Sequence, residues 1–171
     1  LEMLPDSLGG CSELCEIHCE NCVSLASLPE TLAQCPSLSY FELSGCTALK
    51  RLPDLSRSGG TLRELRMNGC SALESLPSLG KMEACQELYL AGCSSLASLP
   101  LELPPALQLL GAKECTAFTT LPEAIGTCAQ LKELELAGCT ALTSLPDTIG
   151  RCEALAALNL CGCTSLASLP G

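Results

Sequence analysis

Apolar residues recur along this chain at fixed offsets, in a pattern that repeats about every 24 residues. In residues 133–136 apolar and charged side chains alternate, which is typical of a short β-strand with one buried face. A cysteine, a leucine and a Leu-Pro pair follow at constant distances before the pattern starts again. The apolar positions of this unit are Leu131, Leu134, Leu136, Cys139, Leu142 and Leu145. Each unit therefore predicts one strand followed by a return segment.

Seven such units follow one another along the chain. They begin at Leu14, Leu38, Leu62, Cys85, Leu107, Leu131 and Leu155, and residues 1–13 match the end of an earlier unit. A period of 20 to 29 residues with this leucine spacing is typical of leucine-rich repeats. We therefore expect an α/β solenoid, a leucine-rich-repeat horseshoe or arc with a parallel β-sheet on the concave face and short 3-10 or irregular segments on the convex face. Residues 1–171 should form a single array, and a fragment of a longer one.

The return segments should be short, because a Leu-Pro pair restricts the backbone at the start of each. Residues 147–152 are long enough for about one 3-10 turn, with Asp147 as its expected cap. Two segments should be poorest in helix. Residues 54–60 contain Gly59-Gly60, and residues 101–106 contain Pro104-Pro105.

Cysteine is frequent, with 15 residues, and seven of these occupy one offset in every unit. A position filled in all seven units indicates a structural role, in which a small apolar thiol donates its weak S–H to a carbonyl in a buried turn. These ladder cysteines are Cys22, Cys46, Cys70, Cys93, Cys115, Cys139 and Cys163. A second offset, on the return segment, holds Cys11, Cys35, Cys128 and Cys152.

Disulfides between stacked turns are the competing interpretation, because strands in a sheet lie about 5 Å apart. Equivalent side chains would point in parallel directions rather than toward each other, and the number of cysteines is odd. These features favour reduced thiols and a cytoplasmic or nuclear location.

One stretch has the spacing of a metal site. Cys15, Cys19 and Cys22 are separated by three and then two residues, with His18 between them. This spacing resembles the iron-sulfur loop of radical S-adenosylmethionine enzymes. The repeat register places Cys19 and Cys22 inside, and Cys15 and His18 outside, so the four side chains should not converge. We therefore expect no metal and no cofactor.

Catalytic constellations are equally scarce. His18 is the only histidine, so any Ser-His-Asp or Cys-His arrangement would have to centre on it. Gly59-Gly60-Thr61 lacks the lysine of a phosphate-binding loop. The sequence does not predict an enzyme.

The outward strand positions vary from unit to unit, whereas the inward positions do not. Such a division is how a solenoid builds a recognition surface. Tyr40, Arg66 and Tyr89 should form one patch, because Tyr and Arg are enriched at interface hot spots. His18 lies one turn away. The full set of partner-binding candidates is Tyr40, Arg66, Tyr89, His18, Glu42, Glu64, Glu87, Glu133 and Glu135. The alternative is that these are ordinary solvated strand residues.

The net charge of −10 limits the partner. An acidic surface repels nucleic acid, so we expect a protein partner with a basic or neutral surface. Arg63, Lys113 and Lys132 lie at the edge of the strand columns. No apolar stretch reaches the roughly 18 residues of a spanning helix, so no membrane association is expected.

Residues 131–150 also resemble the repeats of plant intracellular nucleotide-binding leucine-rich-repeat immune receptors, which share the phrase Gly-Cys-x-x-Leu-x-x-Leu-Pro. In that family the array is a carboxy-terminal sensor of pathogen proteins or modified host proteins. The resemblance implies a protein-recognition module with a role in defence. The other interpretation is a structural spacer whose outer face has no specific ligand.

Overall fold

The computed structural model describes residues 1–58 and 60–170, so the expectation that concerns Gly59 lies outside the described residues. Within them the chain forms a stack of turns made of short strands, loops and 3-10 helices. The strands are β1 (Glu16–His18), β2 (Tyr40–Glu42), β3 (Glu64–Arg66), β4 (Glu87–Tyr89), β5 (Leu109–Gly111), β6 (Glu133–Glu135) and β7 (Ala157–Asn159).

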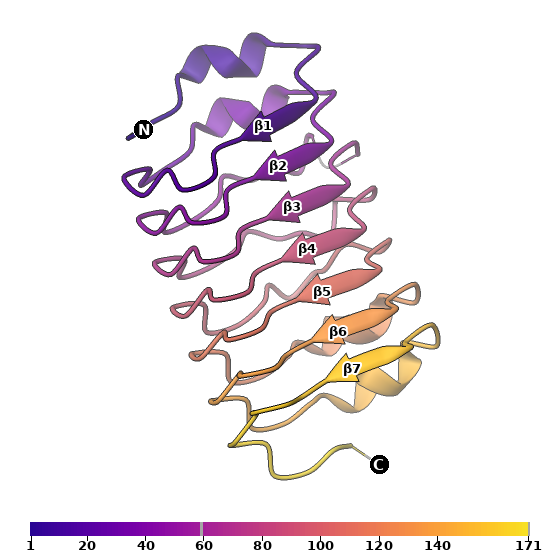
Figure 1. Cartoon of the computed structure of the whole chain (residues 1–171). Helices are drawn as coiled ribbons and strands as arrows, with labels where there is room; N and C mark the ends of the chain where they lie inside the picture. The colour runs from indigo at the N-terminus through magenta and orange to yellow at the C-terminus, as the bar shows by residue number, and fades with distance from the viewer. Residues whose placement is uncertain (59, 171) are drawn as a thin grey trace.

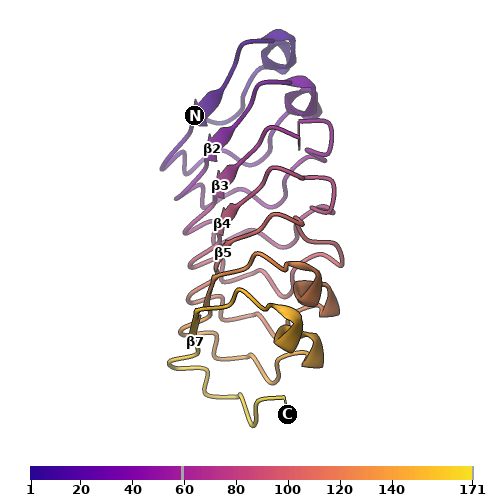
Figure 2. The ribbon, with the colours of Figure 1, turned by 90° about the vertical axis from the view of Figure 1, so that its right-hand side faces the viewer.

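All of these strands pair in parallel in one sheet, and their order in the sheet follows the order along the chain (Figure 1). Seen from the side, the strands form one wall of the stack and the return segments the opposite wall (Figure 2). The sheet does not close on itself. This architecture confirms the predicted solenoid.

The central residue of each strand points into the stack. Phe41, Leu65, Leu88, Leu110 and Leu134 are all 0% exposed, whereas Leu158 in β7 is 40% exposed. Burial of such side chains stabilises the fold by roughly 1.5–3 kcal/mol each. The core is therefore a row of leucine-type side chains running along the axis of the stack.

A left-handed residue after each strand turns the chain toward the return segment. Glycine holds this position in five turns, as at Gly69 with φ 71° and Gly92 with φ 73°. Asn21 and Glu114 take the same conformation at φ 57° and 58°. Without a Cβ, glycine adopts this region at no steric cost, which explains the recurrent Gly-Cys pair.

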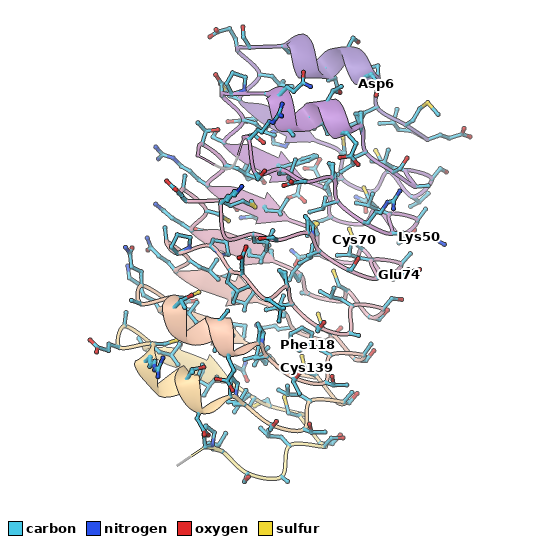
Figure 3. All side chains as sticks on the ribbon, turned by 180° about the vertical axis from the view of Figure 1, so that it is seen from behind. Asp6, Lys50, Cys70, Glu74, Phe118 and Cys139 are labelled. Carbon is cyan, nitrogen blue, oxygen red and sulfur yellow. The ribbon has the colours of Figure 1, made fainter. Side chains whose placement is uncertain are left out.

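The ladder cysteines lie behind this turn and join consecutive turns. Six of them donate an S–H hydrogen bond to a carbonyl of the preceding turn, at sulfur–oxygen distances of 3.0–3.2 Å. Cys139, for example, donates to the carbonyl of Ala112 at 3.0 Å. Figure 3 labels Cys70 and Cys139 within this stack. The second cysteine offset repeats the arrangement, since Cys152 donates to the carbonyl of Ile125 at 3.2 Å.

The return segments differ between the ends and the middle of the array. The 3-10 helices are η1 (Asp6–Gly10), η2 (Glu30–Gln34), η3 (Glu123–Thr127) and η4 (Asp147–Arg151). η1 packs against η2 and η3 against η4. Residues 54–58 and 101–106 contain bends or turns but no helix, as expected.

Two details of the return segments were not as expected. Residues 78–84 also lack a helix, although no glycine or proline pair marks them. The expected cap at Asp147 is wrong: Pro146 occupies the cap position, no side chain caps the helix, and Asp147 is its first residue. The restricted φ of proline, −70° here, already aims the chain into the turn.

No helix in the described residues is long and apolar enough to cross a membrane.

Candidate functional site

The outward residues of the seven strands form two columns on what we call the strand face. The first and third residues of each strand pair with their equivalents in the next strand, so that Glu16 aligns with Tyr40 and His18 with Glu42. The same register continues to β7, where Glu135 aligns with Asn159. All nine candidate residues named from the sequence therefore lie in these two columns.

Three of the candidates form what we call the Tyr–Arg–Tyr cluster, Tyr40, Arg66 and Tyr89, in which Arg66 lies close to both tyrosine rings. The guanidinium carbon of Arg66 lies 4.6 Å from the centroid of the Tyr89 ring and 6.0 Å from that of Tyr40. Both distances are within the range of cation–π attraction. The cluster spans three neighbouring strands, β2, β3 and β4.

Carboxylates hold this cluster in place from beside it. The Tyr89 hydroxyl donates to Glu87 at 2.7 Å, and the Arg66 Nε donates to Glu64. Each of these pairs lies within one strand, two residues apart, because alternate residues share a face. These hydrogen bonds thus restrict the orientation of the Tyr89 ring and of the Arg66 guanidinium.

Glu42 was expected to be exposed and available to a partner, and this expectation is wrong. It is only 6% exposed. Its carboxylate accepts hydrogen bonds from the Tyr40 hydroxyl at 3.2 Å and from the Ser44 N–H at 2.8 Å. Arg66 Nε lies 3.9 Å away. Glu42 therefore supports the cluster from below, and little of it remains for a partner to touch.

The electrostatics of the cluster keep its tyrosines protonated and its arginine charged. Burial, reinforced by the hydrogen bond to Glu87, raises the pKa of Tyr89 to about 12. Burial and the neighbouring Glu42 raise the pKa of Tyr40. The hydrogen bond to Glu64 raises the pKa of Arg66. At neutral pH the cluster thus presents two phenols and one cation.

His18 extends the cluster by one strand. Its ring centroid lies 5.1 Å from that of Tyr40, at an interplanar angle of 35°. Nε2 is 3.1 Å from Glu16 and Nδ1 is 3.6 Å from Glu20. The hydrogen bond to Glu16 raises the pKa of His18, although the side chain is half exposed.

The carboxyl-terminal part of the strand face is acidic and carries smaller side chains. Glu135 accepts a hydrogen bond from the Asn159 amide at 2.9 Å and lies 3.1 Å from the Lys113 ammonium. Glu133 is exposed. In the described part of the chain it makes no side-chain hydrogen bond and no ion pair. The two glutamates therefore differ in how much of their charge is neutralised.

A hollow of about 280 Å³ lies between the cluster and these glutamates, over β5; we call it the β5 hollow. Its floor contains Leu109 and Gly111, and Tyr89 and Glu133 stand on either side. Gly111 is not among the candidate residues named from the sequence. The hollow could have been expected from this residue, because it is the one glycine in a strand column whose neighbours all carry side chains.

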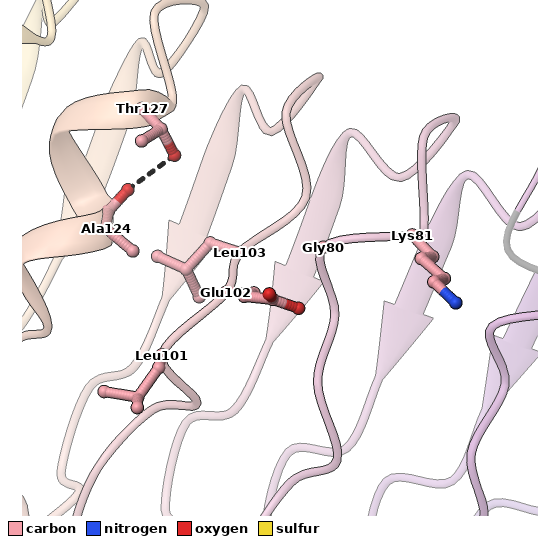
Figure 4. A pocket seen from close by; sticks show the side chains of 7 residues that line it. All are labelled: Gly80, Lys81, Leu101, Glu102, Leu103, Ala124 and Thr127. Carbon is pink, nitrogen blue, oxygen red and sulfur yellow. Dashed lines mark hydrogen bonds between the residues drawn. The ribbon is translucent and has the colours of Figure 1, made fainter.

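A second hollow, of about 320 Å³, lies on the opposite side of the molecule, where the middle return segments lack helices. Figure 4 shows the residues around it, including Lys81, Leu101 and Glu102, next to η3. The Glu102 carboxylate is engaged by the Ser78 hydroxyl at 2.5 Å. The labelled side chains do not converge on one point in Figure 4, so the hollow has no evident chemistry.

The cysteines of the apparent metal motif differ in exposure. Cys19 is 6% exposed and points into the core, whereas Cys15 and His18 are exposed. Among residues 1–58 and 60–170, no group of three or more His, Cys, Asp or Glu side chains is placed to hold a metal ion. All fifteen cysteines are free thiols.

Comparison with known proteins gives similarity of structure rather than of sequence. No protein-family model and no curated protein sequence matches the chain. Among solved structures, the leucine-rich-repeat domain of the type III effector XopL matches 99% of this chain and 68% of its own, at 27% identity and a TM-score of 0.58. The fold is a leucine-rich-repeat solenoid.

Two further leucine-rich-repeat structures agree in fold. Drosophila Toll, in its complex with Spätzle, matches 90% of this array at 22% identity and a TM-score of 0.64, and the match covers 21% of the Toll chain. A leucine-rich-repeat protein of Leptospira interrogans matches 99% of this array at 20% identity and a TM-score of 0.50, over 57% of its own length.

Proposed function

We propose that this array is a non-enzymatic protein-recognition module that binds a partner protein on the strand face, with the Tyr–Arg–Tyr cluster at the centre of the contact. The observation that carries the proposal is the position of Arg66, 4.6 and 6.0 Å from two tyrosine rings. Tyr and Arg side chains that are fixed in advance lose little conformational entropy on binding. The remaining outward candidates would form the periphery of the contact.

The charge of the strand face supports a partner with a basic or neutral surface. Five of its six glutamates are at least partly engaged by other side chains, yet glutamates outnumber arginine and lysine in both columns. Complementary charge mainly increases the association rate and excludes acidic partners. Nucleic acid is the least compatible ligand.

A narrower form of the proposal is ligand sensing in an intracellular immune-type receptor. The Gly-Cys-x-x-Leu-x-x-Leu-Pro phrase of residues 131–150 supports it. The fifteen free thiols suit a reducing cytoplasmic or nuclear compartment. We further propose that residues 1–171 act as a single array.

The test is capture of a partner by the immobilised array from an extract of its source cells. Replacing Tyr40, Arg66 and Tyr89 together by alanine should abolish capture, while circular dichroism shows an intact fold. The matched control replaces three exposed residues of the return side, Lys81, Leu101 and Arg151, and should capture normally. Capture that survives the strand-face change would reject the proposal. If the unaltered array captures nothing, the spacer interpretation is correct instead.

A further inference from the structure

The β5 hollow differs from the rest of the strand face in the size of its side chains. In β5 the outward residues are Leu109 and Gly111, whereas the neighbouring strands present Glu87 and Tyr89 on one side and Glu133 and Glu135 on the other. A short-chained strand between two long-chained strands produces a trough that is open to solvent.

We propose that the β5 hollow binds the side chain of an arginine that the partner protein presents. The inference rests on the proposed function, because it assigns one particular contact within that surface. Three features of the hollow support it: an aromatic wall, an apolar floor and an unengaged carboxylate.

The aromatic wall is the ring of Tyr89. Arg66 stacks on it from the β3 side at 4.6 Å, and the hydroxyl is held by Glu87 at 2.7 Å. Gly111, on the β5 side, leaves the ring uncovered in that direction. The existing contact shows that this ring accepts a guanidinium, and a second one on the opposite side would meet the other face, which is equally electron-rich.

The floor suits the methylene stem of an arginine. Ala91, Leu109 and Gly111 line the hollow, and their exposed atoms are mostly apolar. Long basic side chains lay their methylenes along such surfaces and keep the charged group at the edge. A lysine has a similar stem, but only arginine has a planar group that can stack on the ring while it donates to a carboxylate.

The charged end would meet Glu133. Glu135 is already engaged by Lys113 at 3.1 Å and by Asn159 at 2.9 Å. Glu133 is exposed, and within the described residues its carboxylate has no partner. Guanidinium–carboxylate pairs form two parallel hydrogen bonds, which gives them directional specificity. The hollow therefore has one site of negative charge available, at the edge farthest from Arg66.

The test uses a probe small enough to occupy only the hollow. N-acetyl-arginine N-methylamide is titrated, at concentrations on the order of millimolar, into the ¹⁵N-labelled array, and backbone amide shifts are followed by NMR. The neutral isostere N-acetyl-citrulline N-methylamide is titrated in parallel. Shifts from the arginine probe should centre on Leu109 and Gly111, and the citrulline probe should bind about five-fold more weakly, a ratio that corresponds to roughly 1 kcal/mol.

Two surface variants test the contact through different effects on the two probes, which unfolding alone would not produce. Glu133→Gln should weaken the arginine probe about five-fold and leave the citrulline probe unchanged. Gly111→Val should remove both, because it fills the hollow; its Cβ would lie 3.4 Å from Tyr89 Cδ1, an ordinary contact. The matched control is Glu16→Gln, which changes an exposed glutamate of the same column in β1 and should have no effect.

Equal affinities for arginine and citrulline would overturn the inference, as would shifts centred on β1 or insensitivity to Glu133→Gln. These failures are separable from failure of the proposed function. If Glu133→Gln and Gly111→Val capture the partner normally while the change of Tyr40, Arg66 and Tyr89 abolishes capture, the arginine contact is wrong and the recognition surface stands. If the latter change leaves capture intact, the surface itself is wrong, whatever the probe does.

Discussion

Leu110 and Leu109 are consecutive residues of β5, yet they belong to opposite faces of the sheet. Leu110 is 0% exposed and packs among the equivalent residues of the adjacent turns, whereas Leu109 lies at the floor of the β5 hollow. The same division runs through all seven strands. Inward positions repeat the same few residue types, and outward positions change from strand to strand.

The two faces also differ in how far their hydrogen bonds reach. Inside, the S–H of each of the six donating ladder cysteines crosses a turn boundary and meets the backbone, which is the same whatever the neighbouring sequence. Outside, most side-chain hydrogen bonds join residues two apart in one strand, as between Tyr89 and Glu87. Interior bonds therefore demand constancy, whereas exterior contacts allow each strand to vary.

The largest difference between the interior and the surface should be in the rates at which their cysteine thiols are alkylated. Burial raises the pKa of Cys115 from 9.0 to about 12, which lowers its thiolate fraction at pH 8 about a thousand-fold. In the native state an alkylating reagent should modify Cys11, Cys15 and Cys161 rapidly, because these thiols are exposed. Mass spectrometry after timed quenching gives the rates. In denaturant all fifteen should react alike, and fast native labelling of Cys115 would contradict its burial.

The next largest difference should be in the loss of stability when each of the two adjacent leucines is replaced by alanine. Leu110→Ala leaves a cavity in the core and should lower the free energy of unfolding by about 2–5 kcal/mol. Leu109→Ala removes the same atoms from the strand face and should cost less than about 1 kcal/mol. Urea denaturation followed by circular dichroism measures both. Similar costs for the two variants would show that the faces are not energetically distinct.

Removal of a ladder thiol should have a smaller effect. Cys139→Ala or Cys139→Ser should lower the free energy of unfolding by about 1–3 kcal/mol, because packing is lost or the carbonyl of Ala112 loses a donor of the right length. Cys161→Ala, on an exposed thiol two residues before Cys163, is the matched control. Unchanged denaturation of the Cys139 variants would remove the structural role of the ladder.

The smallest effect should be the pH response of His18. Its pKa is raised by the hydrogen bond to Glu16, so the folded state holds the proton more tightly than the unfolded state, whose pKa is near 6.5. The pair therefore adds stability that is complete below about pH 6.5 and is lost as the pH rises through the folded pKa. NMR titration of the imidazole should show the raised pKa, and Glu16→Gln should lower it. A pKa unaffected by Glu16→Gln would contradict this coupling.

The sequence was sufficient to predict which side chains lie inside and outside, because the same offsets recur in seven units and strands alternate their faces. The register of Tyr40, Arg66 and Tyr89 followed from the same counting. Their actual contacts did not, since these depend on the directions in which long side chains lean. Glu42 shows the limit: its offset is outward, but Tyr40 and Arg66 lean over it and leave it 6% exposed.

Two other features could not be predicted from the residue pattern. One concerns the length of a repeat unit, and the other the missing side chain of a glycine. Residues 78–84 lack a helix, and the unit that contains them, which begins at Leu62, is one residue shorter than the helix-bearing units that begin at Leu14, Leu107 and Leu131. The β5 hollow arises from the missing side chain of Gly111, and its size is set by the neighbouring Tyr89 and Glu133. A single sequence gives no measure of either space.

The thiol-to-carbonyl bonds make one turn boundary chemically equivalent to the next. Excision of residues 107–130 would bring the turn that begins at Leu131 against the turn that begins at Cys85. Cys139 would then meet the carbonyl of Leu90, which now accepts from Cys115 at 3.1 Å, in place of that of Ala112. The array can therefore gain or lose whole turns. Deletion of one complete unit would change the residues of the strand face, whereas the thiol–carbonyl hydrogen bonds of the interior would form again between the new neighbours.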